Sequence, residues 1–383
     1  MKIVIDENIP FAQEAFARLG EVLALPGRTI SPKAIQDATI LVVRSVTPVN
    51  AALLQGSAVQ FVGTATAGCD HIDQGYLRHN KILFASAAGS NANSVAEYVI
   101  SALFLRACKK REVLRGKTLG IIGVGHVGSL LKLKAEAIGM IPILNDPPLQ
   151  RESGKSEYRS LQETCEADFI SLHVPLNDVG EDSTRNLLNE DRLRRINPNT
   201  VIINTARGEV IDPVPLLNQL EKKQLARPIL DVWSNEPSIN WALLEKVEIG
   251  TPHIAGYSLD GKVAGVQMVY ESACAALGVM PSWSRHGLTL PGQRTIEMDA
   301  EEKDELTIFN SLCAQAYHLA SDVKHFMALI NLPLASRSTA FDGLRKTYPI
   351  RRAFQNASLT VPLTQIKWLN QMIGLGFKPR IPK

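Results

Sequence analysis

Short apolar runs alternate with amphipathic stretches over the first 90 residues. The runs are rich in β-branched residues and show no sustained polar alternation, which is typical of strands buried on both faces of a parallel sheet. Helix-like segments at 10–19 and 49–54 separate them, so we expect an open, doubly wound sheet. The predicted strands are Lys2–Ile5, Glu21–Leu25 (the weakest), Thr39–Val43, Val59–Gly63 and Ile82–Phe84.

A second series of strands begins after a long predicted helix at Ser94–Lys109. Six strands with helices between them match a nucleotide-binding α/β domain of the Rossmann kind. We therefore predict an α/β chain with two doubly wound parallel-sheet (Rossmann-like) domains. The six strands are predicted at Thr118–Ile122, Ile141–Asn145, Phe169–His173, Thr200–Asn204, Ile229–Val232 and Glu248–Gly250.

The pattern changes again near Pro281. Two pairs that contain glycine, His286-Gly287 and Pro291-Gly292, and a charged run at Asp299–Glu305 mark a boundary. Beyond this boundary Leu306–Ile330 predicts one long helix. We expect the last hundred residues or so to form a smaller α+β domain.

Composition excludes several classes of protein. The chain has 383 residues, of which 45% are hydrophobic, so it can bury sizeable cores. Forty-one basic and 38 acidic residues leave a net charge of +3, too balanced for a protein that mainly coats nucleic acid or membrane lipid. Five scattered cysteines without a CxxC pair argue against a disulfide framework or a metal site. No apolar run is suited to a signal peptide or a membrane span, so we expect a cytoplasmic protein.

The first chemical motif is a glycine-rich turn between a predicted strand and a predicted helix. Gly123, Gly125 and Gly128 form GxGxxG, in which the glycines allow a tight turn, close approach of a pyrophosphate and helix packing. Asp146 closes the next strand 18 residues after Gly128, where a carboxylate can accept the ribose hydroxyls and repel a 2′-phosphate. The motif predicts NAD as cofactor, the alternative being a plain glycine turn with a solvated aspartate.

Three chemically active side chains follow strand ends of the second series, where ligands bind in such sheets. These are Arg207, Glu236 and His253. An arginine can hold a carboxylate and polarise the adjacent C–O bond, a histidine can exchange the hydroxyl proton, and a glutamate can orient the imidazole. Taken alone, Arg207 is explained as a surface cap, Glu236 as part of a loop ion pair and His253 as a buried structural histidine. Together with the nucleotide loop they predict hydride transfer at a hydroxy acid.

The motifs NTARG, DVWxxEP and TPHIAG, which follow GxGxxG, resemble those of the D-2-hydroxyacid dehydrogenase family. The stretch Asn93–Tyr98 is similar to the helix that links that family's two domains. The resemblance implies that Arg207 binds substrate, that His253 is the acid/base and that Glu236 is its partner. It also implies further NAD contacts at His126, Val127, Asp146, Pro175, Ala206, Asp231 and Gly256.

Other stretches resemble the 4-phosphoerythronate dehydrogenase subfamily of pyridoxal phosphate biosynthesis, namely 2–10, 42–47, 63–71, 145–148, 253–258 and 341–352. The resemblance implies Ser45, Thr66 and Tyr257 as substrate contacts. We add Arg44 because of its charge and its place at a strand end, where Arg, Ser and Thr can hold a carboxylate or phosphate. A helix cap with turn residues is the alternative interpretation.

The resemblance further implies a division of the chain into three domains and a homodimer. The predicted domains are a discontinuous, flavodoxin-like substrate-binding domain (1–92 and 256–281), an NAD-binding Rossmann domain (93–255) and a dimerisation domain (282–383). The basic residues Arg345, Lys346, Arg351 and Arg352 are explained by a solvated face or dimer salt bridges. A sharper hypothesis is that one of these arginines reaches a substrate phosphate.

The resemblance implies oxidation of 4-phospho-D-erythronate at C2 with NAD, giving 2-oxo-3-hydroxy-4-phosphobutanoate. One alternative is another NAD-dependent D-2-hydroxyacid dehydrogenase, acting on phosphoglycerate or glycerate. A second is an NAD-sensing, non-enzymatic protein like the transcriptional corepressors related to this family. We expect a phosphorylated hydroxy acid as ligand, and no nucleic acid, membrane or metal.

Overall fold

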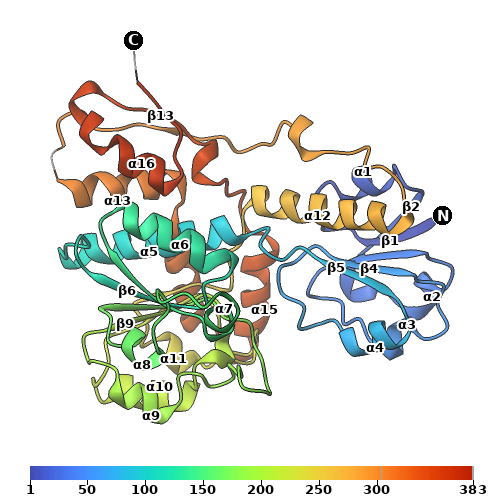
Figure 1. The fold of residues 1–383 in the computed structure, drawn as a ribbon, viewed down its shortest axis with the longest axis horizontal. Helices are drawn as coiled ribbons and strands as arrows, with labels where there is room; N and C mark the ends of the chain where they lie inside the picture. The colour runs from blue at the N-terminus through green and yellow to red at the C-terminus, as the bar shows by residue number, and fades with distance from the viewer. Residues whose placement is uncertain (303, 382–383) are drawn as a thin grey trace. The chain divides into compact units, whose positions relative to one another are not determined.

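The structure, a computed structural model, describes residues 1–302 and 304–381. The chain divides into two compact units, and each is described by itself (Figure 1). Unit 1 comprises Met1–Asn91 and Ser258–Pro291, and unit 2 comprises Ala92–Tyr257 and Gly292–Lys383. None of the helices in the described residues combines the length and apolar character that a membrane span requires.

Unit 1 contains a parallel five-stranded sheet in the order β2-β1-β3-β4-β5, the flavodoxin-like order. All five strands predicted from the sequence are present. Alternate residues of each strand enter apolar clusters on opposite faces, which explains why the strands are apolar at nearly every position. The strands are β1 (Lys2–Asp6), β2 (Glu21–Leu25), β3 (Ile40–Val43), β4 (Phe61–Thr64) and β5 (Leu83–Ser86).

Helices cover both faces of this sheet. One apolar cluster joins it to α1 and α12, and the other joins it to α2, α3 and α4. The long helix α12 therefore belongs to unit 1, although it follows the second strand series in the chain (Figure 1). The helices are α1 (Ala12–Phe16), α2 (Pro32–Ile35), α3 (Ala51–Leu54), α4 (Gln74–His79) and α12 (Leu259–Leu277), with short 3-10 turns at Gly27–Thr29 and Arg285–Gly287.

Unit 2 contains a parallel six-stranded sheet in the order β11-β10-β9-β8-β6-β7. The chain leaves β6 toward one side of the sheet for β7 and then crosses to the other side for β8. The carboxyl end of β6 is therefore the switch point at which doubly wound sheets bind ligands. The strands are β6 (Thr118–Ile122), β7 (Ile141–Asn145), β8 (Phe169–Leu172), β9 (Val201–Asn204), β10 (Ile229–Leu230) and β11 (Ile249–Gly250).

Two helix layers enclose the unit 2 sheet. One face packs against α5 and α6, and the other against α9, α10 and α11 (Figure 1). The helix predicted at Ser94–Lys109 is confirmed as α5. The helices are α5 (Ala92–Lys110), α6 (His126–Ala137), α7 (Pro147–Ser153), α8 (Leu161–Thr164), α9 (Glu190–Arg195), α10 (Pro213–Glu221) and α11 (Trp241–Leu244), with a 3-10 turn at Gly208–Val210.

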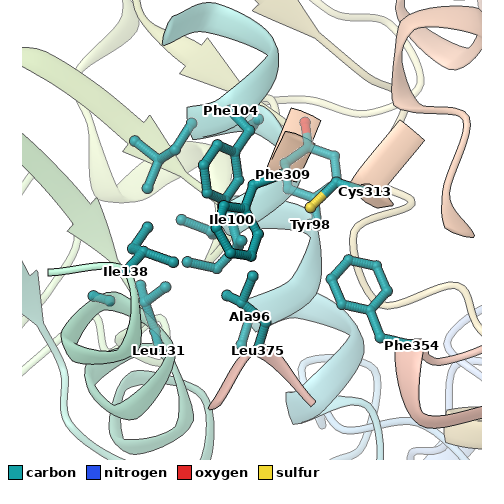
Figure 2. Close-up of a cluster of buried hydrophobic side chains, with 14 of the residues drawn as sticks. Ala96, Tyr98, Ile100, Phe104, Leu131, Ile138, Phe309, Cys313, Phe354 and Leu375 are labelled. Atoms are coloured by element: carbon teal, nitrogen blue, oxygen red, sulfur yellow. The ribbon is translucent and has the colours of Figure 1, made fainter. Parts of the chain in front are cut away.

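The C-terminal segment, Gly292 onward, packs into the core of unit 2. Phe309 stacks on Phe104 of α5 with ring centroids 5.6 Å apart, and Phe354 and Leu375 join the same cluster (Figure 2). The division of the chain into three domains stays a prediction. The segment contains α13 (Glu305–Ala316), α14 (Leu319–Met327), α15 (Leu334–Lys346) and α16 (Leu369–Leu375), 3-10 turns at Ala328–Asn331, Phe354–Asn356 and Leu363–Trp368, and a parallel sheet of β12 (Thr295–Ile296), β13 (Ser358–Thr360) and β14 (Pro379–Arg380).

The prediction of one helix over Leu306–Ile330 is wrong. The helix breaks at Tyr317, whose backbone is extended (φ −143°, ψ 113°). Phe309 of α13 packs in the cluster on the α5 side of the sheet, whereas Phe326 of α14 packs in the cluster on the opposite side. A straight helix could not place Phe309 and Phe326 in clusters on opposite faces of the sheet, so the chain bends between the two residues.

Arg351 corrects the expectation of a solvated basic face, because its side chain is almost completely buried. Its guanidinium donates to the carbonyl oxygens of Ala255 (2.9 Å) and Ser94 (2.6 Å) and lies 3.8 Å from the centroid of the Tyr317 ring. These contacts tie the C-terminal segment to the start of α5 and to the residues that follow β11. Burial is tolerated here because carbonyl dipoles and an aromatic face replace water around the charge.

Two more buried charges join the C-terminal segment to α5 and α6. Glu97 of α5 accepts a hydrogen bond from the backbone N–H of Phe354 at 2.9 Å, and Lys134 of α6 donates to the carbonyl oxygen of Leu375 at 2.6 Å. Burial raises the pKa of the Glu97 carboxyl, against the opposing charges of Lys134 and Arg351. Burial likewise lowers the pKa of Lys134. A polar network therefore supplements the apolar core between these segments.

We predict that Phe309→Ala destabilises the protein by about 3–5 kcal/mol, because it leaves a cavity in a fully packed core. Urea unfolding followed by circular dichroism measures the change. The control is Leu363→Ala, at a position that is 68% exposed in the same segment, which should change stability by less than about 0.5 kcal/mol. Equal effects of the two substitutions would show that the C-terminal segment contributes no core to the fold.

Candidate active site

The structure brings Glu236 and His253 into direct contact in unit 2. Glu236 follows β10 and His253 follows β11, its neighbour in the sheet, so both lie at the carboxyl edge. The Nδ1 atom of His253 lies 2.7 Å from Oε2 of Glu236. This confirms that the two side chains predicted to act together are adjacent.

Arg207 is presented by a turn that the preceding strand end builds. The side chain of Asn204, the last residue of β9, accepts from the N–H of Ala206 at 3.0 Å and donates to the carbonyl oxygen of Arg207 at 2.8 Å. A side chain at Gly208 would begin 2.0 Å from the carbonyl carbon of Trp233. The backbone after Arg207 therefore packs directly on the loop that carries Glu236, which only glycine permits.

The Glu236 carboxylate is fixed at both oxygens. Its Oε1 atom accepts from the backbone N–H of Trp233 at 2.9 Å, while Oε2 meets His253. Burial alone would raise the pKa of Glu236, but the charge and hydrogen bond of His253, the Trp233 N–H and the charge of Arg345 together lower it below its ordinary value. Glu236 is therefore held as an anion beside the imidazole.

Asp231 holds the loop that carries His253. Its buried carboxylate accepts from the hydroxyl of Thr251 (2.6 Å) and from the backbone N–H groups of Ile254 (2.8 Å) and Ala255 (2.9 Å). Burial raises the pKa of Asp231, although His253 and these hydrogen bonds oppose the rise. The backbone of His253 is left-handed (φ 57°), which is uncommon outside glycine, and these bonds on the following residues fix it. The predicted contact of Asp231 with NAD stays a prediction.

The geometry of this pair suits proton transfer. An ionised carboxylate can only accept hydrogen bonds, so Nδ1 of His253 carries the hydrogen that points to Glu236. The Nε2 atom of the neutral ring then has a lone pair with which to take a proton. An anionic partner such as Glu236 can stabilise an imidazolium, so the arrangement is suited to general acid/base chemistry.

The glycine-rich turn fits the pyrophosphate of a dinucleotide. A side chain at Gly123, which is left-handed (φ 88°), would begin 2.8 Å from the backbone of His173, and one at Gly128 would begin 2.1 Å from the carbonyl oxygen of Gly123. At Gly125, just before α6, a side chain would meet no atom within 4 Å. The outer glycines are thus needed for packing, and the middle one leaves space beside a helix N-terminus, where phosphate is favoured.

Asp146 connects the turn to α7. Its carboxylate accepts from the backbone N–H of Val124 at 2.8 Å and from that of Leu149 at 3.0 Å. It therefore lies at the carboxyl end of β7 beside the glycine turn, where a ribose contact is expected. The other predicted NAD contacts are also in unit 2: His126 and Val127 open α6, Pro175 follows β8, Ala206 follows β9 and Gly256 follows β11. Their roles stay predictions.

His173 follows β8 and has no role assigned from the sequence. Its ring lies between Ser171 (Nε2 to Oγ, 2.8 Å) and Thr205 (Nδ1 to Oγ1, 3.3 Å). Burial lowers the pKa of His173 to about 3, so the ring is neutral at physiological pH. We interpret it as a packing residue beneath Gly123, not as an acid or base.

The predicted substrate residues of unit 1 follow β3 and β4. Arg44 pairs with the buried carboxylate of Asp6, with Nε 2.9 Å from Oδ2 and Nη2 3.3 Å from Oδ1. Thr66 lies 2.8 Å from the Thr64 hydroxyl, oxygen to oxygen, and Ser45 is exposed in the turn after Arg44. The sequence pattern did not reveal the Asp6 partner, because nothing in it links residues 38 positions apart.

Tyr257 lies in unit 2 among aromatic and basic side chains of the C-terminal segment. Its ring packs edge-on against Tyr348 (centroids 5.7 Å apart) and beneath the guanidinium of Arg345 (5.6 Å). The sequence had shown Arg345 only as part of a basic run. The positive charge was the only signal in the sequence, and it does not predict that Arg345 lies against Tyr257.

Residues 94–255 match the family model described as D-isomer specific 2-hydroxyacid dehydrogenase, NAD binding domain. The chain is also 42% identical to the erythronate-4-phosphate dehydrogenase of Klebsiella pneumoniae (strain 342), over 98% of each chain. It is 42% identical to the enzyme of that name from Proteus mirabilis (strain HI4320), over 98% of this chain and 99% of that one. The chain belongs to the erythronate-4-phosphate dehydrogenase family. It is an NAD-dependent oxidoreductase of the D-2-hydroxyacid dehydrogenase type.

Solved structures confirm the fold. The D-lactate dehydrogenase of Aquifex aeolicus, complexed with NAD and lactic acid, matches with a TM-score of 0.62 and 25% identity over 73% of this chain and 96% of that one. The NAD-bound 3-phosphoglycerate dehydrogenase of Entamoeba histolytica matches equally well, with 26% identity over the same shares. About a quarter of this family member therefore lies outside the region shared with these structures.

We predict that Glu236→Gln reduces stability at neutral pH and that the loss becomes smaller in acid. The lowered pKa of Glu236 means that its carboxylate stabilises the fold above the ordinary carboxyl pKa of about 4.3. This contribution fades as the pH falls through the lower folded-state value. Urea unfolding at pH 7 and pH 3.5 measures both differences. Glu152→Gln, at an exposed position, is the control, and a deficit that is equal at both pH values would contradict the prediction.

Proposed function

We propose that the chain oxidises 4-phospho-D-erythronate at C2 with NAD, giving 2-oxo-3-hydroxy-4-phosphobutanoate for pyridoxal 5′-phosphate biosynthesis. One observation supports this choice of substrate. Curated erythronate-4-phosphate dehydrogenases align over 98–100% of this chain in several cases, including the part beyond the lactate and phosphoglycerate dehydrogenase structures. Neither alternative hypothesis from the sequence has such support.

The residues of unit 2 have distinct roles in this reaction. Arg207 binds the substrate carboxylate through its guanidinium fork and polarises the C2–O bond. Nε2 of His253 takes the hydroxyl proton, and Glu236 stabilises the resulting imidazolium. NAD, when bound, accepts the hydride from C2. Loss of the proton and hydride converts the C2 alcohol into a ketone, so atoms and electrons balance.

Several further features belong to this proposal. Ser45, Thr66 and Tyr257 contact the substrate, as the subfamily resemblance implies, and Arg44 supplies positive charge near Ser45. The protein acts in the cytoplasm as a homodimer joined through residues 282–383. The resemblance of residues 341–352 to the subfamily's dimerisation domain supports the dimer.

We predict that His253→Ala lowers kcat about 100- to 10,000-fold while the Kd for NADH changes little, because the variant loses the proton acceptor and keeps the glycine turn. Steady-state kinetics and a fluorescence titration with NADH measure the two effects. Unchanged turnover would exclude His253 as the acid/base.

A steady-state substrate panel tests the proposed substrate. With NAD as oxidant, 4-phospho-D-erythronate should give a higher kcat/KM than 3-phosphoglycerate or glycerate. A higher value for either of those acids would overturn the proposal. Absence of turnover with every hydroxy acid, together with tight NADH binding and a protein partner, would favour the corepressor hypothesis instead.

A further inference from the structure

Helix α15 of the C-terminal segment packs against the loop that carries Glu236. The hydroxyl of Ser338 lies 3.1 Å from that of Ser238, two residues beyond Glu236. The guanidinium of Arg337 lies 5.5 Å from the centroid of the Trp241 ring. One face of α15 is therefore part of the surroundings of the catalytic pair.

The same face is anchored by a buried aromatic side chain. Phe341 is completely buried, and its ring lies 5.5 Å from that of Phe326, which in turn lies 5.7 Å from Trp233 in the Glu236 loop. Residues four apart on a helix share a face, so Arg345 projects on the side of α15 that Phe341 anchors. The position of Arg345 is thus set by packing.

Arg345 has an unsatisfied buried donor. Among the described residues, its Nε atom has no hydrogen-bond partner, although it is shielded from solvent. Arg337, on the same helix, donates through Nε and Nη2 to the carbonyl oxygens of Leu332 and Ile330. A buried guanidinium N–H without an acceptor is costly, and arginine cannot avoid the cost by losing its proton. Within the described part of the chain the Nε atom of Arg351 is unpaired as well, but its Nη1 and Nη2 donate to carbonyl oxygens, so Arg351 and Arg337 serve the fold. Arg345 is the one of these three arginines that is suited to an anionic ligand.

The surroundings of Arg345 hold it in place as a cation. Its guanidinium lies 5.6 Å from the centroid of the Tyr257 ring, four residues after His253, and such a ring attracts and orients a cation. Burial would lower the pKa of Arg345, but Tyr257 and the carboxylates of Glu236 and Asp231 raise it. The charge is thus permanent and lies beside the His253 loop.

We propose that Arg345 binds the phosphate of the substrate and selects a phosphorylated hydroxy acid. This inference rests on the proposed function. The substrate is anionic at both ends, and Arg207 holds the carboxylate next to C2, whose hydroxyl proton His253 accepts. The phosphate carries the second negative charge, and the guanidinium fork of Arg345 matches its oxygen atoms. The C-terminal segment thereby supplies a specificity residue as well as core packing.

Two substrates that differ only in the phosphate test this role. For Arg345→Gln, kcat/KM with 4-phospho-D-erythronate should fall about 10- to 150-fold, the range for loss of a charged hydrogen bond. That with D-erythronate should fall by a clearly smaller factor, because it loses only the charge of Arg345 near Glu236. Arg345→Lys should recover part of the loss. Lys346→Gln removes the neighbouring exposed charge and should leave both values unchanged.

Inorganic phosphate supplies a second readout. It should inhibit the wild type competitively with 4-phospho-D-erythronate and inhibit Arg345→Gln more weakly. Equal losses with both substrates, or equal inhibition of both enzymes, would overturn the role of Arg345 while leaving the proposed function intact. A wild type that does not prefer 4-phospho-D-erythronate in the substrate panel would overturn both. An unchanged Kd for NADH shows that unit 2 of each variant is folded.

Discussion

The arrangement of unit 2 depends on the buried carboxylate of Asp231. An aspartate removed from water is costly unless its oxygens are hydrogen-bonded, and here the acceptors are filled by the Thr251 hydroxyl and two backbone N–H groups. Those N–H groups belong to the residues that follow His253. The need to satisfy a buried charge therefore fixes the backbone that carries His253, and Glu236 then has a defined ring to bind.

The C-terminal segment holds the same loop from another direction. Arg351 donates to the carbonyl oxygen of Ala255, whose N–H is bound by Asp231. After His253, the N–H of Ala255 is thus held by the Asp231 carboxylate, and the carbonyl oxygen of Ala255 is held by the Arg351 guanidinium. A segment outside the NAD-binding family model therefore shares the core of unit 2 and contacts the loop that follows His253.

The parts predicted correctly from the sequence follow from regular geometry. Parallel strands buried on both faces are largely apolar, as in β3 and the first three residues of β9. Residues such as Glu236 and His253 meet because neighbouring parallel strands end at one edge. The break at Tyr317 and the burial of Arg351 depend on partners far along the chain. Neither hydrophobic periodicity nor a run of basic residues contains that information, so the C-terminal segment was the part least predictable.

Asp231 and Glu236, the two carboxyl groups near His253, have different surroundings. Burial raises the pKa of Asp231, whose oxygens are occupied by the loop, whereas His253 and the Trp233 N–H keep that of Glu236 low. Only Glu236, among the described residues, accepts a hydrogen bond from the ring. If both carboxylates met the imidazole directly, the imidazolium would be stabilised further and would release its proton less readily. The structure therefore separates a carboxyl group that holds the loop, Asp231, from the one that meets the ring, Glu236.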